Sequence, residues 1–147
     1  MKVALLDVNV LIALAWPNHV HHELALEWFK ERQPLGWATC PTTQSGFVRV
    51  SSNRQVLPNA KSPYEALLLL QRITALPHHV FWADDIAMTN SHFIAPMKIQ
   101  GYRQVTDAHL LALALRQDGC LATLDRGVRH VVPEGFSANE VICLLTK

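Results

Sequence analysis

One segment in the second half of the chain passes directly from a helical pattern into a strand pattern, and each part carries one acid. Residues 106–115 read Thr-Asp-Ala-His-Leu-Leu-Ala-Leu-Ala-Leu, typical of a helix with Thr106 as its N-cap and Asp107 in its first turn. Residues 121–125 read Leu-Ala-Thr-Leu-Asp and indicate a buried strand that ends at Asp125. In a parallel sheet flanked by helices, such a helix start and strand end meet at one edge. We therefore expect the two carboxylates to face one crevice.

The N-terminus has a similar apolar run that ends at an acid. Residues 3–6 are apolar and precede Asp7, which is typical of a strand buried on both faces. Further apolar runs predict four more strands, the last of them at an edge of the sheet. They span residues 37–40, 79–83, 120–124 and 141–145.

Helical patterns lie between these runs, and the alternation predicts a three-layer α/β domain with a mainly parallel sheet. We expect Thr42 or Thr43 to cap one helix, Ser62 another, and Gly119 to end the helix that Thr106 begins. The helices are expected over residues 10–16, 21–32, 43–50, 63–76 and 106–118. Asp84 and Asp85 are expected to cap a further short helix, and residues 90–102 to be mostly loop.

Length and charge narrow the class of protein. The chain has 147 residues, and we predict that residues 1–147 form one domain. Its 13 Lys and Arg residues nearly balance 12 Asp and Glu residues, so only a local basic patch can bind nucleic acid. Cys40, Cys120 and Cys143 lack zinc-type spacing and are expected to be reduced core residues. Without a signal sequence or membrane-spanning run, a soluble cytoplasmic protein is predicted.

Four polar residues are expected together at the carboxyl edge of the sheet, where open α/β sheets bind their ligands. Asp7 and Asp125 follow strands, whereas Gln44 and Asp107 lie in first turns of helices. Three carboxylates without an interleaved Lys or Arg repel one another unless a cation lies between them. Oxygen ligands favour Mg²⁺, with Mn²⁺ as a substitute. The sequence thus predicts a metal site at the three aspartates and metal-assisted attack of water on a phosphodiester.

At these residues the chain resembles the PIN-domain family, and within it the VapC-type toxin ribonucleases of bacterial toxin–antitoxin pairs. The resemblance rests on residues 6–11, which read Leu-Asp-Val-Asn-Val-Leu, on residues 105–114 and on residues 121–125, in the family's order. It implies a PIN-like α/β/α fold with sheet order 3-2-1-4-5, a divalent metal and endonucleolytic cleavage of RNA. It also implies a homodimer and a cognate antitoxin.

Carried over by position, the resemblance implies a role for several residues. Asp7, Asp107 and Asp125 look like the metal-binding acids, Asn9 like a residue that orders the loop at Asp7, and Thr106 like a cap that touches the site. Nearby arginines can neutralise RNA phosphates, although each can equally be an ordinary solvated charge. These are Arg103 and Arg126, with Arg49, Arg54 and Arg129 as further candidates.

Gln44 departs from the family pattern, which usually has a glutamate after the second strand. An amide has the shape of a carboxylate without its charge, so it can still coordinate a metal or hold a water. We therefore include Gln44 among the catalytic residues and expect weaker metal binding than in a relative with four acids. Arg126 and Gly127 stand where the family often has a further acidic or polar residue. The acidic cluster is therefore expected to carry still less negative charge than in such relatives.

Other functions remain open. The main alternative is a catalytically weakened PIN-fold module that binds RNA or a protein, and metal-dependent turnover distinguishes it from an enzyme. The short chain disfavours a DNA-directed nuclease. A haloacid dehalogenase-type phosphatase needs an acid where Asn9 stands, and a receiver domain needs an acid pair near the first strand. Asp84 and Asp85 are left out of the site, and His109 is not expected to be the general base because it lies on a different helix face from Asp107.

Apolar side chains near the N-terminus exceed what one small core demands. We expect a homodimer or an antitoxin helix to bury Trp16, Trp28 and Phe29, unless they are core residues. The same two readings apply to residues 67–70, where the core is slightly favoured.

Overall fold

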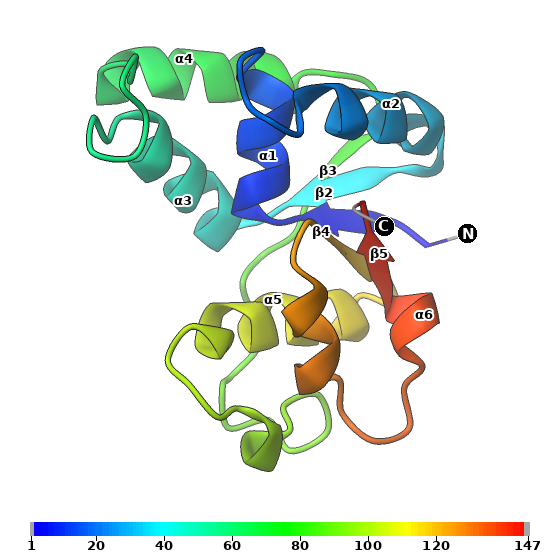
Figure 1. Cartoon of the computed structure of the whole chain (residues 1–147). Helices are drawn as coiled ribbons and strands as arrows, with labels where there is room; N and C mark the ends of the chain where they lie inside the picture. Colours follow the sequence, from blue (N-terminus) through cyan, green and yellow to red (C-terminus); the bar gives the residue numbers. More distant parts are fainter. Residues whose placement is uncertain (1, 146–147) are drawn as a thin grey trace.

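Five short apolar segments pair into a single parallel sheet (Figure 1). The computed structural model describes residues 2–145 of the chain. The strands are β1 (Ala4–Leu6), β2 (Trp37–Thr39), β3 (His79–Phe81), β4 (Cys120–Thr123) and β5 (Ile142–Leu144). They are hydrogen-bonded in the order β3-β2-β1-β4-β5, and every neighbouring pair is parallel. The expected order 3-2-1-4-5 is confirmed, with β5 at an edge.

Helices cover both faces of this sheet. The α-helices are α1 (Val8–Ala15), α2 (His22–Arg32), α3 (Pro41–Ser51), α4 (Pro63–Thr74), α5 (Gln104–Arg116) and α6 (Ala138–Val141). Short 3₁₀ helices are η1 (Gln33–Leu35), η2 (Pro96–Lys98) and η3 (Arg126–Val131). Figure 1 shows α1 to α4 on one face of the sheet and α5, α6 and η3 on the other. The predicted three-layer α/β/α arrangement is therefore confirmed.

The sheet divides the interior into two cores, because successive side chains of a strand point to opposite faces. In β1, Leu5 packs with the leucines of α5, whereas Leu6 packs with α1 and α3. Trp16 and Phe29 belong to the second core and are almost fully buried within the chain. The expectation that a partner buries these two side chains is therefore wrong. Trp28 is only partly buried against the same core.

Of residues 67–70, which were expected to lie either in the core or under a partner, some are buried and some are exposed. Leu70 is buried in the core beside α1, and Leu69 packs partly against it. Leu67 and Leu68 point outward and remain exposed. One face of α4 is thus core and the other is accessible.

Three helices begin before the predicted residues. Helix α1 starts at Val8 rather than at residue 10, with Asp7 as its N-cap. Helix α3 starts at Pro41 with Cys40 as its N-cap, so neither Thr42 nor Thr43 is the cap; the Thr43 hydroxyl instead accepts a hydrogen bond from the Cys40 N–H at 3.0 Å. Helix α5 starts at Gln104, which leaves Thr106 inside the first turn rather than at the cap. The predicted Ser62 cap of α4 is confirmed, since its hydroxyl accepts a hydrogen bond from the Glu65 N–H.

The end of α5 also differs from the prediction. Asp118, not Gly119, adopts the left-handed conformation there, with φ of 53°. Gly119 is needed for a different reason: a Cβ at this position would lie 2.6 Å from the Val3 carbonyl oxygen and 2.7 Å from the Trp82 ring. The glycine lets the chain turn closely from α5 into β4.

The segment after β3 contains no helix, contrary to the expectation for Asp84 and Asp85. Residues 82–87 are extended coil because their side chains bond to other elements, as described below. Residues 90–102 are mostly loop, as expected, apart from η2. Across residues 2–145, no helix has the length and apolar character needed to cross a membrane.

Candidate active site

Asp7 lies at the centre of the carboxyl edge, between β1 and α1. Its Oδ1 accepts a hydrogen bond from the Val10 N–H at 2.9 Å, so it is the N-cap of α1 as well as the residue that ends β1. Only 6% of Asp7 is exposed. Burial raises the pKa of its carboxyl group from 3.8 to about 6, although hydrogen bonds from Thr123 and Val10 act in the opposite direction.

Thr123 connects Asp7 to Asp125. It is the last residue of β4 and is fully buried. Its hydroxyl bonds to the Asp7 carboxylate and accepts a hydrogen bond from the Asp125 N–H at 3.0 Å. The sequence analysis treated Thr123 only as a strand residue. A hydroxyl on a buried strand, two residues before a predicted site acid, was the available signal.

Asp107 and Asp125 come from the opposite face of the sheet. Asp107 is half-buried in the first turn of α5, and burial followed by the charges of Asp125 and Asp7 raises its pKa to about 6. Asp125 caps η3 by accepting a hydrogen bond from the Gly127 N–H at 2.7 Å. The negative charge of Asp125 raises the pKa of both Asp7 and Asp107. The structure thus brings the three aspartates close enough to interact electrostatically.

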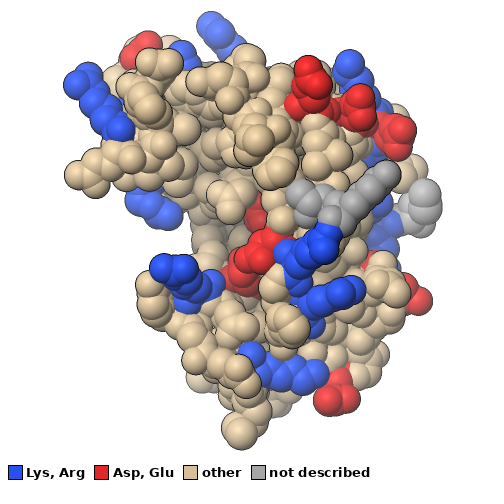
Figure 2. Space-filling model, in the orientation of Figure 1, with Lys and Arg blue, Asp and Glu red and all other residues tan. Residues whose placement is uncertain are grey.

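The surface around this group carries both signs of charge. Figure 2 shows acidic side chains in a hollow between the two helical layers, with Lys and Arg side chains on either side of it. Among the residues that the structure describes, none of the three aspartates pairs with a Lys or Arg. Their negative charge is therefore available to an external cation.

Gln44 lies in the first turn of α3 and is half-buried. Its Nε2 donates a hydrogen bond to the Thr39 hydroxyl at 3.0 Å, and this hydroxyl also lies 2.7 Å from Nε2 of His79. The side chain lines a groove of about 610 Å³ between α3 and α4. The amide is thus held by Thr39 at the end of β2, and its place in a metal site stays a prediction.

The predicted substrate-binding residues are all exposed. Asn9 follows Asp7 in α1, and its backbone N–H bonds to the Asp7 carboxylate. Arg103 is at the N-cap position of α5, with its guanidinium 5.7 Å from the centre of the Tyr102 ring. Thr106 immediately precedes Asp107. Arg126 lines a cavity of about 120 Å³ beside Asp125. Their contacts with a substrate remain predictions.

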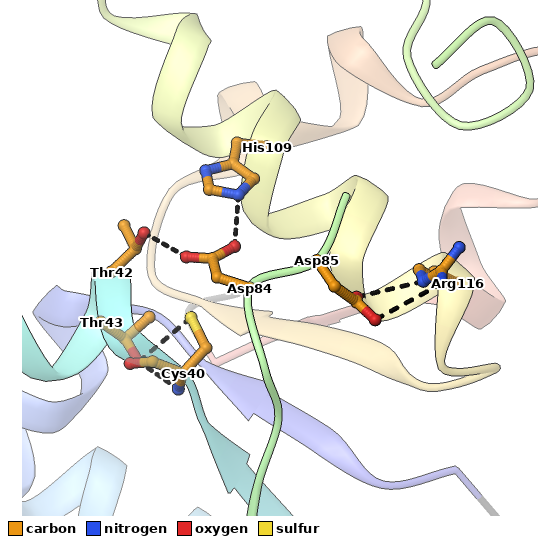
Figure 3. A network of polar contacts seen from close by, with 7 residues as sticks. All are labelled: Cys40, Thr42, Thr43, Asp84, Asp85, His109 and Arg116. Carbon is orange, nitrogen blue, oxygen red and sulfur yellow. Dashed lines mark hydrogen bonds and ion pairs between the residues drawn. The ribbon is translucent and has the colours of Figure 1, made fainter. Parts of the chain in front are cut away.

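A second polar group links the two helical layers near this edge (Figure 3). One oxygen of Asp84 lies 2.5 Å from Nε2 of His109 on α5, and the other accepts a hydrogen bond from the Thr42 hydroxyl on α3 at 2.5 Å. Asp85 pairs with Arg116 near the end of α5, at 3.1 Å. Asp84 therefore joins α3 to α5 instead of capping a helix.

The comparison with protein families agrees with this geometry. Residues 4–132, which include all three aspartates, match the PIN domain. The chain belongs to the PIN-domain family. It is 52% identical over 126 residues to Ribonuclease VapC38 of Mycobacterium tuberculosis, a match that covers 86% of this chain and 87% of that protein. Ribonuclease VapC39 of the same organism is 48% identical over 133 residues, covering 90% and 96%.

A third relative covers nearly the whole of both chains. Ribonuclease VapC44 of M. tuberculosis is 43% identical over 141 residues, which are 96% of this chain and 99% of that protein. These similarities identify the chain as a VapC-type PIN protein. The resemblance on which the sequence analysis relied is thereby confirmed.

A Mg²⁺ ion can be held either by a cage of several protein ligands or by one or two carboxylates together with water, and the residues of this PIN protein fit the second arrangement. Within residues 2–145, no three His, Cys, Asp or Glu side chains converge closely enough to form a metal cage on their own. Mg²⁺ does not need such a cage, because it commonly binds through one or two carboxylates and keeps several waters. Asp7 and Asp107 provide two carboxylates whose charge is poorly neutralised by the protein. The residues present therefore suit a partly hydrated ion.

Proposed function

We propose that this PIN protein is a Mg²⁺-dependent endoribonuclease and acts as the toxin of a toxin–antitoxin pair, with Mn²⁺ as a possible substitute. The relatives named Ribonuclease VapC, up to 52% identical, support the reaction class. The observation that carries the metal dependence is the group of three aspartates without a Lys or Arg partner among the described residues, and the pKa of Asp7 and Asp107, raised to about 6, agrees with it. At neutral pH the buried Asp7 and the half-buried Asp107 are ionised at a cost that a bound cation would remove.

Each residue has a defined part in the proposal. Asp7 and Asp107 would hold the ion, with Asp125 beside them; when bound, Mg²⁺ supplies positive charge and activates water for attack on phosphorus. Thr123 and the Val10 N–H fix the orientation of the Asp7 carboxylate. The remaining predicted residues would orient water or contact the RNA backbone. They are Gln44, Asn9, Thr106, Arg103 and Arg126.

The proposal extends to binding partners and location. We propose a cognate antitoxin protein that blocks RNA cleavage, a homodimer in solution, and a cytoplasmic location. Light scattering on the purified chain tests the homodimer directly. A monomer at micromolar concentration would contradict this part of the proposal and leave the nuclease assignment intact.

Cleavage of a mixed pool of tRNA and ribosomal RNA tests the central claim. The purified protein is incubated with the pool in Mg²⁺, in Mn²⁺ and in EDTA. We expect discrete fragments with either metal and none in EDTA. Mapping of the fragment ends would then identify the sequence that is cut.

Two variants distinguish the protein's own activity from a contaminating nuclease. Asp107→Asn removes one site charge and should abolish the fragments. Asp118→Asn is the matched control, because this side chain is 96% exposed just beyond α5 and asparagine tolerates its left-handed backbone. If neither the natural chain nor the control cuts RNA but both retain it in a binding assay, the protein is a PIN-fold binding module.

A further inference from the structure

Two cysteines meet on one face of the sheet, away from the aspartates. Cys120 begins β4 and Cys143 lies in the neighbouring edge strand β5, where it is in register with Ala122. Residues 120 and 122 point to the same face of β4, so both thiols face the same core. Their sulfur atoms are only 3.1 Å apart. A disulfide bond at about 2.05 Å would bring the two sulfur atoms about 1 Å closer together.

A guanidinium group lies against this pair. Nη2 of Arg32 donates a hydrogen bond to the Cys120 sulfur at 3.2 Å and another to the Lys2 carbonyl oxygen. Nε of Arg32 is buried and has no hydrogen-bond partner among the residues described. An arginine is permanently charged, so this side chain places a fixed positive charge beside two thiols. Such a charge favours a thiolate, which is the reactive form of cysteine.

The two thiols differ in reactivity and access. A hydrogen bond from Cys120 and the charge of Arg32 lower the pKa of Cys143 to about 7, against the opposing effect of burial. The same contact and burial raise the pKa of Cys120. Cys143 is partly exposed, whereas Cys120 is buried. Cys143 is thus the more accessible residue of the pair, and the direction of the two pKa shifts favours its thiolate.

Cys40 offers an internal comparison. It is fully buried at the start of α3, and burial raises the pKa of its thiol. Its polar neighbour is the Thr43 hydroxyl rather than a second sulfur or a cation. Cys40 should therefore react slowly and has no cysteine with which to form a bond within the described chain.

We propose that Cys143 and Cys120 form a reversible disulfide when the protein meets hydrogen peroxide. The Cys143 thiolate attacks the peroxide oxygen, which gives a sulfenic acid and, with one proton, releases water. The Cys120 sulfur then attacks the Cys143 sulfur, and the sulfenic oxygen leaves with two protons as a second water. The two thiols are oxidised by two electrons and the peroxide is reduced. An excess of external dithiol reverses the reaction.

The bond would join the edge strand β5 covalently to its neighbour β4. Strand β5 has three residues and pairs only with β4. The disulfide would close the loop that contains Asp125, η3 and α6. Because cross-links reduce the freedom of the unfolded chain, the oxidised protein should melt at a higher temperature than the reduced one. This inference does not depend on the proposed nuclease activity.

Treatment of the full chain with hydrogen peroxide tests the proposal. Intact mass should fall by two hydrogen atoms, and peptide mapping should place the bond between Cys120 and Cys143 while Cys40 stays reduced. Dithiothreitol should restore the original mass. Oxidation of Cys40 at the same rate, or overoxidation of Cys143 with no cross-link, would overturn the proposal.

Variants separate the steps. Cys120→Ser should leave Cys143 to accumulate sulfenic and sulfinic acid, and Cys143→Ser should remove the reaction altogether. Cys40→Ser should form the disulfide at the natural rate. Arg32→Gln should slow it about tenfold, the loss of thiolate that one pKa unit produces, and Arg32→Lys should slow it less. Circular dichroism checks that each variant is folded, and an unchanged rate in folded Arg32→Gln would exclude the role of the guanidinium.

Discussion

Two groups of acids lie near the carboxyl edge of the sheet, and they differ in how their charge is balanced. Asp84 is bonded to His109 and Thr42, so both of its oxygens have partners from the protein. Asp7 and Asp107 have no Lys or Arg partner among the described residues, and burial, with the charge of Asp125, raises their pKa to about 6. The comparison teaches that a balanced carboxylate joins two elements, whereas the unbalanced group keeps the net negative charge on which the proposed cation site rests.

The largest expected difference between the two groups is in catalysis. Asp107→Asn should reduce the rate of RNA cleavage by about 100-fold or more, because it removes a charge at the proposed metal site. Asp84→Asn should cost less than about tenfold, since it weakens a contact between helices without touching the site. Single-turnover cleavage of one mapped RNA measures both rates. Equal losses would show that the two groups cannot be distinguished by charge balance.

Removing the charge of Asp7 should stabilise the fold, whereas changes at Asp84 should destabilise it. The raised pKa of Asp7 means that the folded state binds the proton more tightly than the unfolded chain, so the associated stability is present below pH 3.8 and is lost as pH rises through about 6. Asp7→Asn keeps an oxygen for the Val10 N–H but carries no charge. It should increase the free energy of unfolding at pH 7.5 by up to about 3 kcal/mol, the equivalent of the shift from 3.8 to about 6.

Urea unfolding at pH 4 and pH 7.5, in EDTA, measures this effect. The natural chain should lose stability between the two pH values, and Asp7→Asn should lose less. Asp118→Asn is again the matched control and should follow the natural chain. Added Mg²⁺ should stabilise the natural chain at pH 7.5 but have little effect on Asp7→Asn. A less stable Asp7→Asn at pH 7.5 would contradict the assignment.

Asp84→Ala should destabilise the fold by about 2 kcal/mol, because it leaves the partly buried side chains of His109 and Thr42 without their shared partner. Thermal and urea unfolding at pH 7.5 give the change. Asp85→Ala removes the more exposed ion pair with Arg116 and should cost less than about 1 kcal/mol. A larger loss in Asp85→Ala would show that Asp84 is not the stronger link.

The smallest expected effect concerns Gln44. Gln44→Glu adds a fourth acid and should tighten Mg²⁺ binding by roughly five- to tenfold, or about 1 kcal/mol. Titration calorimetry at pH 7.5 measures the affinity. Gln55→Glu, on an exposed loop, adds the same charge elsewhere and should leave it unchanged. Equal or weaker binding by Gln44→Glu would place this residue outside the metal shell.

Much of the fold follows from local patterns, because the apolar runs that end at Asp7 and Asp125 fix both the strands and the edge at which the acids lie. Helix starts were less predictable. The side chain of Gln104 accepts hydrogen bonds from the N–H groups of Gln100 and Gly101, which moves the start of α5 ahead of Thr106. That bond depends on how the preceding loop folds back.

The roles of Asp84 and Thr123 could not be predicted for a related reason. Asp84 connects two helices that lie far from it in the sequence, so its local pattern of two adjacent aspartates indicated only a cap. Thr123 is fully buried, and its hydroxyl acts through contacts between the ends of β1 and β4. Both depend on tertiary contacts, whereas strand ends depend on sequence alone.

The strand order also determines when the site can form during synthesis. Strand β1 pairs on one side with β2, which follows it closely, and on the other side with β4, in which Cys120 is in register with Ala4. The nascent chain can therefore assemble β1, β2 and β3 with their helices while Asp107 and Asp125 are still to be translated. The acidic group is completed only when β4 inserts beside β1. A ribosome making this protein thus carries an incomplete acidic group until the last part of the chain has emerged.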